Sequence, residues 1–259
     1  MSRSSSDTPL LSIVVPAYNE KERIPDTIRH ITGFMASQEY PMELLVVDDG
    51  SDDGTADVVE QLRDGQRDVR VIRNDHRGKA YTVRTGMLAA RGDYVLFTDA
   101  DSSTPIEEAA RVVACLREGW DVVIGSREAP GAKRFNEPAF RHLMGRIFTR
   151  LVQTITGLRF EDTQCGFKAF TRIAARDVFT RVRLYGPDSP ALKRAKVTGF
   201  DVELLFLAQK RGLRIRELPV RWYYAPGTKV SAVRDSFSNL LDALKVRLYD
   251  VQGRYDAGS

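Results

Sequence analysis

The sequence predicts an α/β fold with a mostly parallel sheet and helices on both of its faces. Short apolar runs rich in Val, Ile and Leu alternate with stretches whose apolar residues recur at helical spacing, which is the order of βαβ units. Each apolar run is followed by a loop of Asp, Asn, Gly and Ser residues. Because parallel strands end at one edge of a sheet, we expect these loops to meet there and form a ligand site.

The first half contains five predicted strands, and a predicted helix follows each of the first four. The first helix is expected from about Asn19. The fourth is expected to begin after Thr104, because Thr104, Pro105 and Glu107 match a capping box with Pro at the first helical position. In order, the strands are the runs LSIVV, ELLVV, VRVIR, YVLFT and DVVIG.

The second half does not continue the alternation of strands and helices. It contains basic helices, a DTQCGFKAF segment and a late strand near LRIRELPVRW. No internal repeat and no Pro/Gly/Ser-rich spacer separates the halves. The sequence therefore predicts a flexible tail over residues 1–9 and a single domain over residues 10–250.

Composition excludes several classes of protein. With 42% hydrophobic and 29% charged residues the chain resembles a soluble protein, and no apolar run approaches the roughly 18 residues that span a bilayer. Cys115 and Cys165 match no metal or redox spacing, so two buried free thiols and a cytoplasmic location are expected. The net charge of +4 permits an anionic ligand, but we find no nucleic-acid motif and expect no nucleic-acid partner.

The stretch DGSDDGTADVVE, Asp49–Glu60, matches the ligand spacing of a calcium loop. A calcium loop of this type joins two helices, whereas the run before Asp49 reads as a buried strand. Asp53 or Thr55 is instead expected to cap the helix that follows. The acids of this stretch therefore need another role.

Asp99 and Asp101 stand two residues apart, directly after a predicted strand. Paired carboxylates at a strand end suit Mg²⁺ or Mn²⁺, which take a few protein carboxylates together with the oxygens of a bound diphosphate. Such acids can also serve only as turn formers and helix caps. The glycine motifs of P-loop and dinucleotide-binding enzymes are absent, which disfavours both classes.

Several motifs together resemble the family 2 glycosyltransferases of GT-A fold. SIVVPAYNE, VVDDGSDDGT, GKAYTVRTGMLAARGDYVLFTDAD and VIGSR resemble the nucleotide-sugar half of that family, in order and spacing. DTQCGFKAFT and GFDVELLFLA look like the dolichyl- and polyprenyl-phosphate β-glucosyltransferases within it. The resemblance spans Leu11 to Lys245 and implies a Rossmann-like sheet with an acceptor-side helical extension. It assigns residues 10–127 to the nucleotide sugar and residues 128–250 to the acceptor.

The resemblance also implies site residues. Tyr18 would offer a ring face to the base, Glu20 would bind the ribose, and Asp49 would accept the imide N–H of the base. Asp99 and Asp101 would hold the metal. The full donor set would be Pro16, Ala17, Tyr18, Glu20, Asp49, Lys79, Asp99, Ala100 and Asp101; the acceptor phosphate would meet Arg127, Arg134 and Lys229; and the catalytic residues would be Asp99, Asp101, Asp162 and Asp201.

The implied activity is an inverting, metal-dependent transfer of glucose from a UDP-sugar to a polyprenyl (dolichyl-type) phosphate. A phosphate acceptor is already ionised near neutral pH, since its second pKa is about 6, and needs no strong base. For a hydroxyl acceptor, Asp162 or Asp201 could act as base. A GDP-mannose-dependent mannosyltransferase and a transferase with a soluble hydroxyl acceptor remain alternatives.

A lipid acceptor would require contact with a membrane, and one predicted helix suits that contact. This helix, Phe140 to Ile155, is expected either to lie in an anionic membrane interface at the cytoplasmic face or to pack on the sheet. The helix from about Ala232 to Tyr249 leaves the same two options. In the first helix the expected apolar face is Phe140, Leu143, Met144, Ile147, Phe148, Leu151, Val152 and Ile155, with Arg141, Arg146 and Arg150 away from it.

Overall fold

The structure, a computed structural model, describes residues 8–63, 65, 67–186, 190–191, 199–224 and 232–256. Strands and helices alternate through the first half, as the sequence predicts, and helices dominate the second. The elements are β1 Leu11–Ala17, α1 Ile24–Ala36, β2 Met42–Asp48, α2 Thr55–Arg63, β3 Val69–Arg73, α3 Lys79–Ala89, β4 Tyr94–Thr98, α4 Glu108–Arg117, β5 Val122–Ser126, β6 Lys133–Phe135, α5 Ala139–Thr156, β7 Phe167–Thr171, α6 Arg172–Arg181, α7 Phe200–Lys210, β8 Ile215–Pro219, β9 Arg221–Tyr223 and α8 Ala232–Val251.

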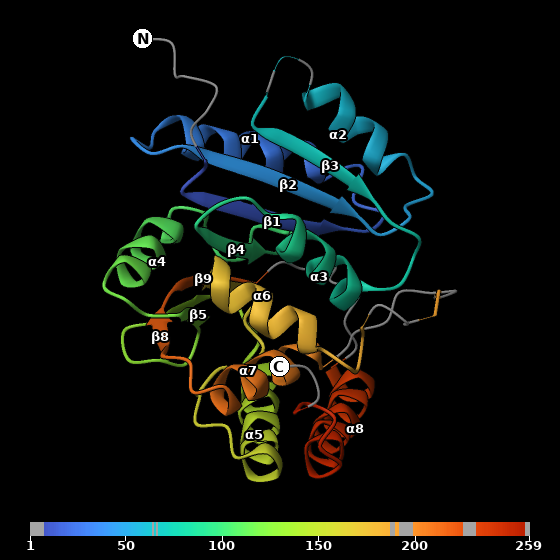
Figure 1. Ribbon diagram of the computed structural model, residues 1–259, viewed down its shortest axis with the longest axis vertical. Helices are drawn as coiled ribbons and strands as arrows, with labels where there is room; N and C mark the ends of the chain where they lie inside the picture. The colour runs from blue at the N-terminus through green and yellow to red at the C-terminus, as the bar shows by residue number, and fades with distance from the viewer. Residues whose placement is uncertain are drawn as a thin grey trace.

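A seven-stranded sheet with the order β3-β2-β1-β4-β7-β5-β8 forms the centre of the molecule (Figure 1). Its neighbours are parallel except at β7, which runs antiparallel to both β4 and β5. The pairing sets Phe167, at the start of β7, opposite Thr98, at the end of β4. The entry into β7 therefore lies at the same edge as the ends of the parallel strands. β6 and β9 form a separate parallel pair.

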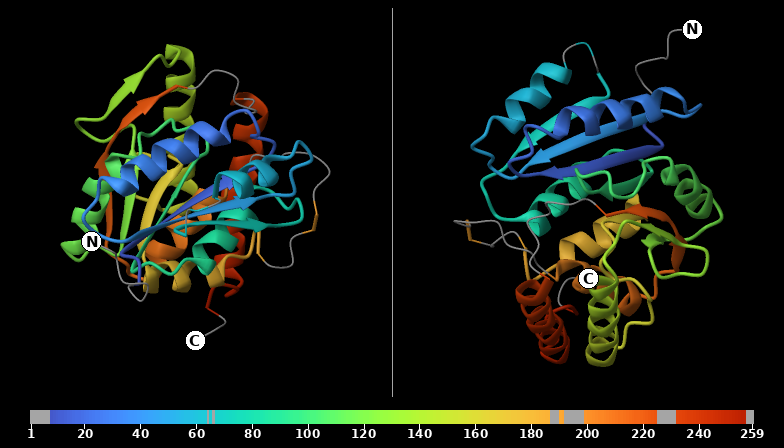
Figure 2. Two further views of the ribbon diagram at one scale, coloured as in Figure 1. Left: turned by 90° about the horizontal axis from the view of Figure 1, so that it is seen from above. Right: turned by 180° about the vertical axis from the view of Figure 1, so that it is seen from behind.

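Side-chain alternation along the strands separates two apolar cores. In β1, Leu11, Ile13 and Val15 face the core that α1, α2 and α4 cover, whereas Val14 faces the core that α3, α6 and α7 cover. Helices thus lie on both faces of the sheet (Figure 2), and the predicted α/β fold class is confirmed.

Helices α5, α7 and α8 form the predicted helical extension. α8 packs against both α5 and α7, and α5 and α8 lie side by side at the end of the molecule farthest from α2 (Figure 1). Neither these helices nor any other in the described ranges combines the length and the apolar character needed to cross a membrane.

Two predicted helix starts are wrong, because contacts between loops override the local capping pattern. α1 begins at Ile24 instead of near Asn19, since Asn19 has a left-handed backbone (φ 53°) and its amide donates to Ser51 Oγ of the next loop. α4 begins at Glu108, and Thr104 is buried near Cys165 instead of capping it. Both cysteines are buried free thiols, as predicted.

The buried carboxylate of Glu203, on α7, connects α7 to the segments that follow α6 and α8. Its oxygens accept hydrogen bonds from the Arg183 and Leu184 amides and from the Tyr255 hydroxyl, at 2.8 to 3.3 Å. Burial raises the pKa of Glu203 to about 7, against the effect of these hydrogen bonds and with help from the charge of Asp242. The folded state therefore holds this proton to a higher pH than the unfolded chain does.

We expect the free energy of unfolding to fall as pH rises from about 5 to 8, because a carboxyl whose pKa is raised on folding destabilises the fold once it ionises. A pKa near 7 against an ordinary 4.5 corresponds to roughly 3 kcal/mol at most. Glu203→Gln keeps an acceptor oxygen but cannot ionise, so its urea unfolding curves should lose this slope. Glu118→Gln, an exposed change, should retain it. Equal slopes in the parent and Glu203→Gln would contradict this role.

Candidate functional site

Backbone-to-side-chain hydrogen bonds join the β1–α1 loop to the β2–α2 loop at the carboxyl edge of the sheet. The Glu20 amide donates to Thr55 Oγ1 at 2.9 Å, and the Lys21 amide donates to Asp53 Oδ2 at 3.0 Å. Asp53 Oδ1 also accepts from the Thr55 amide, so Asp53 caps α2 as predicted. Burial opposes the charged form of Asp53, but these hydrogen bonds outweigh it and lower its pKa. Within the stretch that resembles a calcium loop, Asp53 therefore joins the two loops and caps α2.

Asp49, directly after β2, holds the β3–α3 loop. This carboxylate is buried, and its Oδ1 accepts from the Arg77 and Gly78 amides at 2.9 and 3.1 Å. Its Oδ2 accepts from the Gly78 amide and lies 2.8 Å from His76 Nδ1. Both oxygens are engaged within the chain. The expectation that Asp49 accepts an imide N–H from a bound base therefore stays a prediction, to which the structure adds a positioning role.

His76 is a candidate site residue that the sequence did not single out. Its ring stacks on Tyr18, with centroids 4.0 Å apart and planes 6° apart. Its Nε2 is buried and has no hydrogen-bond partner among the described residues. Burial and the charges of Asp52 and Asp49 raise the pKa of Tyr18. The only sequence signal was the position of the NDHRGK loop at the carboxyl edge of the sheet.

Lys79, the first residue of α3, meets Asp99, the residue that follows β4. The chain turns at Gly78 (φ 93°) into α3, whose first residue is Lys79. Lys79 Nζ lies 2.5 Å from Asp99 Oδ1, so the two side chains form an ion pair. Burial disfavours the charged form of Lys79, but the charges of Asp99 and Asp201 outweigh it and raise its pKa.

Asp101 lies two residues beyond Asp99, in the turn that follows β4. Asp101 Oδ1 accepts from the Ser103 amide at 2.9 Å, and Ser102, between Asp101 and Ser103, has a left-handed backbone (φ 53°). Burial, and then the charge of Asp99, raise the pKa of Asp101. Ala100 is buried, and its carbonyl accepts a 2.7 Å hydrogen bond from Thr27 Oγ1 of α1. α1 thus holds the turn that carries both carboxylates.

The two carboxylates fit a divalent cation. They repel each other, and the single ammonium of Lys79 can balance only one of their two charges. Carboxylate oxygens are the ligands that Mg²⁺ and Mn²⁺ prefer. Across the described ranges, no group of three or more His, Cys, Asp or Glu side chains is arranged to hold a metal. A metal here would need further oxygens from a bound ligand.

The loop before β7 closes on Asp99. Gly166 approaches so closely that a Cβ atom there would lie 2.2 Å from Asp99 Oδ2, so any larger residue would displace the Asp99 carboxylate. Two residues on, the fully buried Lys168 donates from Nζ to Asp201 Oδ1 of α7 at 2.6 Å. The structure thus brings Asp201 toward the site, since its charge also acts on Lys79.

Arg127 and Asp162 form a buried pair. Asp162 Oδ2 accepts from Arg127 Nε at 2.7 Å and Oδ1 accepts from Nη2 at 2.9 Å, while the guanidinium lies 5.2 Å from the ring centre of Trp222. Burial would raise the pKa of Asp162, but the adjacent Arg127 charge holds it well below its usual range. Much of the guanidinium is therefore already occupied by Asp162.

The remaining predicted site residues have partners within the chain or lie outside the described residues. Arg134, on β6, is bound to Glu128 and Glu137, and Lys229 lies outside the described residues. Glu20 pairs with Arg23 at 3.2 Å. Pro16 and Ala17 end β1, where the Ala17 carbonyl accepts from the Asp49 amide at 2.9 Å. The roles predicted for these residues stay predictions.

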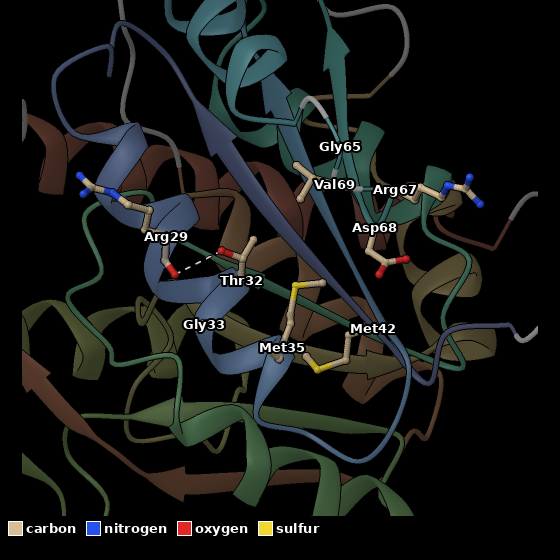
Figure 3. A pocket seen from close by; sticks show the side chains of 10 residues that line it. Arg29, Thr32, Gly33, Met35, Met42, Gly65, Arg67, Asp68 and Val69 are labelled. Carbon is tan, nitrogen blue, oxygen red and sulfur yellow. Dashed lines mark hydrogen bonds between the residues drawn. The ribbon is translucent and has the colours of Figure 1, made fainter. Parts of the chain in front are cut away.

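A hollow of about 680 Å³ lies elsewhere, at the amino ends of β2 and β3 (Figure 3). Arg29 and Met35 of α1 line it on one side, and Met42 and Val69 line it on the other. Parallel α/β sheets bind ligands at the opposite, carboxyl edge, where Asp99, Asp49 and their neighbours converge. The candidate site is therefore the carboxyl edge and not this hollow.

Comparison with known proteins bears on this arrangement. The family model described as glycosyl transferase family 2 matches residues 12–179. A dolichyl-phosphate beta-glucosyltransferase of Drosophila melanogaster is 34% identical over 249 residues, which cover 88% of this chain and 72% of that protein.

Two solved structures share the fold. One is glucosyl-3-phosphoglycerate synthase from Mycobacterium tuberculosis in complex with UDP, with a TM-score of 0.61 and 20% identity over 97% of this chain and 82% of that one. The other is a mannosyltransferase from Pyrobaculum calidifontis in complex with GDP-Man and Mn²⁺, with a TM-score of 0.55 and 20% identity over 98% and 77%. At these identities the likeness shows the fold alone.

The Arg127–Asp162 pair predicts a large loss of stability when one partner is removed. Asp162→Ala leaves the partly buried Arg127 guanidinium without its counter-charge, which we expect to lower the free energy of unfolding by about 3 kcal/mol. Asp57→Ala breaks an exposed pair with Arg73 and should change it by under about 1 kcal/mol. Chemical denaturation measures both. Similar small losses in the two variants would show that the buried pair is not structural.

Proposed function

The chain belongs to glycosyltransferase family 2, and from that membership we propose that it is an inverting enzyme that moves glucose from UDP-glucose to a polyprenyl phosphate. The relative named dolichyl-phosphate beta-glucosyltransferase, similar along most of both chains, supports this donor and acceptor. The family supplies the reaction class. The residues at the carboxyl edge supply the rest of the argument.

The donor binds across the loops after β1, β2, β3 and β4. Tyr18, Asp49 and His76 lie at the end that suits the base, because they combine a stacked ring, a fixed carboxylate and a buried ring nitrogen. Lys79 lies at the end that suits the diphosphate, at the amino terminus of α3, where the helix dipole and the ammonium both favour anions. Pro16, Ala17 and Glu20 complete the nucleoside side.

Asp99 and Asp101 would hold Mg²⁺ or Mn²⁺ together with the donor diphosphate. When bound, the ion supplies positive charge that stabilises the departing nucleoside diphosphate. Lys79 counters the negative charge of Asp99 and orients it toward the donor. The two carboxylates are the basis for proposing a metal. The Mn²⁺ in the Pyrobaculum mannosyltransferase is not, because that protein is only 20% identical.

The choice of acceptor follows from Asp162 and Asp201, the two predicted bases, because each carboxylate is already paired with a cation. Asp162 is held ionised by Arg127, with a pKa well below its usual range, and is therefore a poor proton acceptor. Asp201 is bonded to the buried Lys168. A hydroxyl acceptor needs a base, whereas a phosphomonoester is ionised near neutral pH. The arrangement therefore favours a polyprenyl phosphate over a soluble hydroxyl acceptor, and Asp162 and Asp201 act by positioning.

A polyprenyl acceptor stays in the bilayer, so the enzyme has to work at a membrane surface. We place it as a peripheral protein at the cytoplasmic face, where nucleotide sugars are present and a reducing environment keeps Cys115 and Cys165 as thiols. The acceptor phosphate meets the positive charge that Arg127 retains at the β5 end of the site. Arg134 and Lys229 remain proposed acceptor contacts.

The test is a transfer assay that offers UDP-glucose and GDP-mannose in turn with a short-chain polyprenyl phosphate and Mn²⁺ or Mg²⁺. Mass spectrometry of the lipid product should show one added hexose from UDP-glucose. Product from GDP-mannose alone would establish the mannosyl alternative. Transfer only to a soluble hydroxyl compound would exclude the lipid acceptor.

Asp101→Asn should lower turnover roughly a hundredfold or more, because it removes one of two anionic ligands from the site. Thermal stability should not fall, since Asp99 and Asp101 repel each other in the parent. Asp26→Asn, an exposed change on α1, serves as the matched control and should keep parental turnover. Parental activity in Asp101→Asn at saturating metal would contradict the assignment of these carboxylates.

A further inference from the structure

Large apolar side chains are exposed mainly on two neighbouring helices. Eight of the ten large hydrophobic residues that are exposed in the described part of the chain lie on α5 and α8. The exposed fractions reach 67% at Phe140 and 78% at Val251. We call these eight residues the apolar ridge: Phe140, Leu143, Ile147 and Leu151 on α5, and Leu241, Leu244, Leu248 and Val251 on α8.

The ridge is a second apolar face on helices that already bury one. Phe148 and Val152 of α5 and Ala243 and Val246 of α8 are buried in the core. The ridge residues recur every three or four positions along each helix and therefore form one stripe per helix. Because α5 packs against α8, the two stripes belong to neighbouring elements at one end of the molecule (Figure 1).

This arrangement corrects the expectation from the sequence. The predicted face of α5 included Phe148 and Val152, which point into the core, so α5 both packs on the fold and leaves a separate stripe exposed. The two options left open for this helix are combined in one element. A core face fixes the helix, and packing alone does not explain the exposed stripe.

Basic side chains accompany the ridge. Arg146 and Arg150 of α5 are exposed and form no ion pair among the described residues. Lys245 and Arg247 are also exposed, on α8, where they pair with Asp242 and Asp250 of the same helix. Apolar stripes flanked by Arg and Lys are the composition of helices that lie in an anionic membrane interface. A symmetric contact between two copies would instead bring like charges together, which disfavours a dimer through this face.

We propose that the apolar ridge of α5 and α8 docks the protein on an anionic bilayer, with the ridge side chains in the headgroup and acyl boundary and the basic side chains on the phosphates. The inference rests on the proposed function in one respect, since a polyprenyl phosphate acceptor gives the bilayer its purpose. Its structural basis, the exposure of the ridge and its charge, is independent of the reaction.

The experiment is flotation of the full chain with phosphatidylcholine vesicles that contain about a third phosphatidylglycerol. The parent should float at low salt, and the bound fraction should fall as salt rises, because Arg and Lys contacts are screened. Leu143→Glu with Ile147→Glu, and separately Leu244→Glu with Leu248→Glu, should weaken vesicle binding at least tenfold. These positions are exposed, so circular dichroism and thermal midpoints should match the parent.

Ile173→Glu is the matched control, since Ile173 is 83% exposed on α6, outside the ridge, and its variant should float like the parent. Flotation of the ridge variants at the parental level would overturn the proposal, as would a parent that never floats. A parent dimer in light scattering that dissociates in the ridge variants would assign the ridge to a second copy and also overturn it.

A second assay separates the docking surface from the reaction. Transfer to a polyprenyl phosphate dissolved in detergent should be nearly equal in the parent and in the ridge variants, because detergent brings the acceptor to the site without a bilayer. Variants that lose vesicle binding but keep this transfer support the ridge as a docking surface. Vesicle binding by a parent that transfers to no polyprenyl phosphate would contradict the proposed function while the docking surface stands.

Discussion

The close approach of the loop before β7 to the end of β4 is the constraint on which the site depends. Asp99 leaves β4 and lies against Gly166, where a Cβ atom would overlap its carboxylate. This contact exists because β7 is inserted antiparallel between β4 and β5, so its entry meets the exits of the parallel strands. Both halves of the chain thus contribute to one edge, with the donor loops on one side of Asp99 and the loop of Asp162 on the other.

Charge balance around this contact separates two kinds of carboxylate. Asp162 and Asp201 each have a cationic partner within the fold, Arg127 and Lys168, which compensates the charge of the carboxylate. Asp99 and Asp101 repel each other, and among the described residues Lys79 is the cation that forms an ion pair with Asp99. The carboxylates of Asp99 and Asp101 thus carry excess negative charge at the place where a divalent ion and a diphosphate would bind.

Local sequence patterns predicted the elements of the fold well and their contacts poorly. The five strands of the first half follow from apolar runs, and the convergence of Asp49, Lys79 and Asp99 follows from the rule that parallel strands end at one edge. The pairing of Arg127 with Asp162 joins residues 35 positions apart, and no local pattern encodes it. The stacking of His76 on Tyr18 is likewise a contact between separate loops. α5 was ambiguous because one helix carries two apolar faces, and only the packing shows which residues each face contains.

Binding of Mn²⁺ in the presence and absence of UDP, followed by electron paramagnetic resonance, tests most directly that Asp99 and Asp101 share a metal with the donor diphosphate. Two carboxylates alone leave most of the coordination sphere to water, whereas the diphosphate adds further oxygens. We expect weak binding of Mn²⁺ by the protein alone and tight binding of one ion per chain once UDP is present. Tight binding without UDP, or no gain when UDP is added, would contradict it.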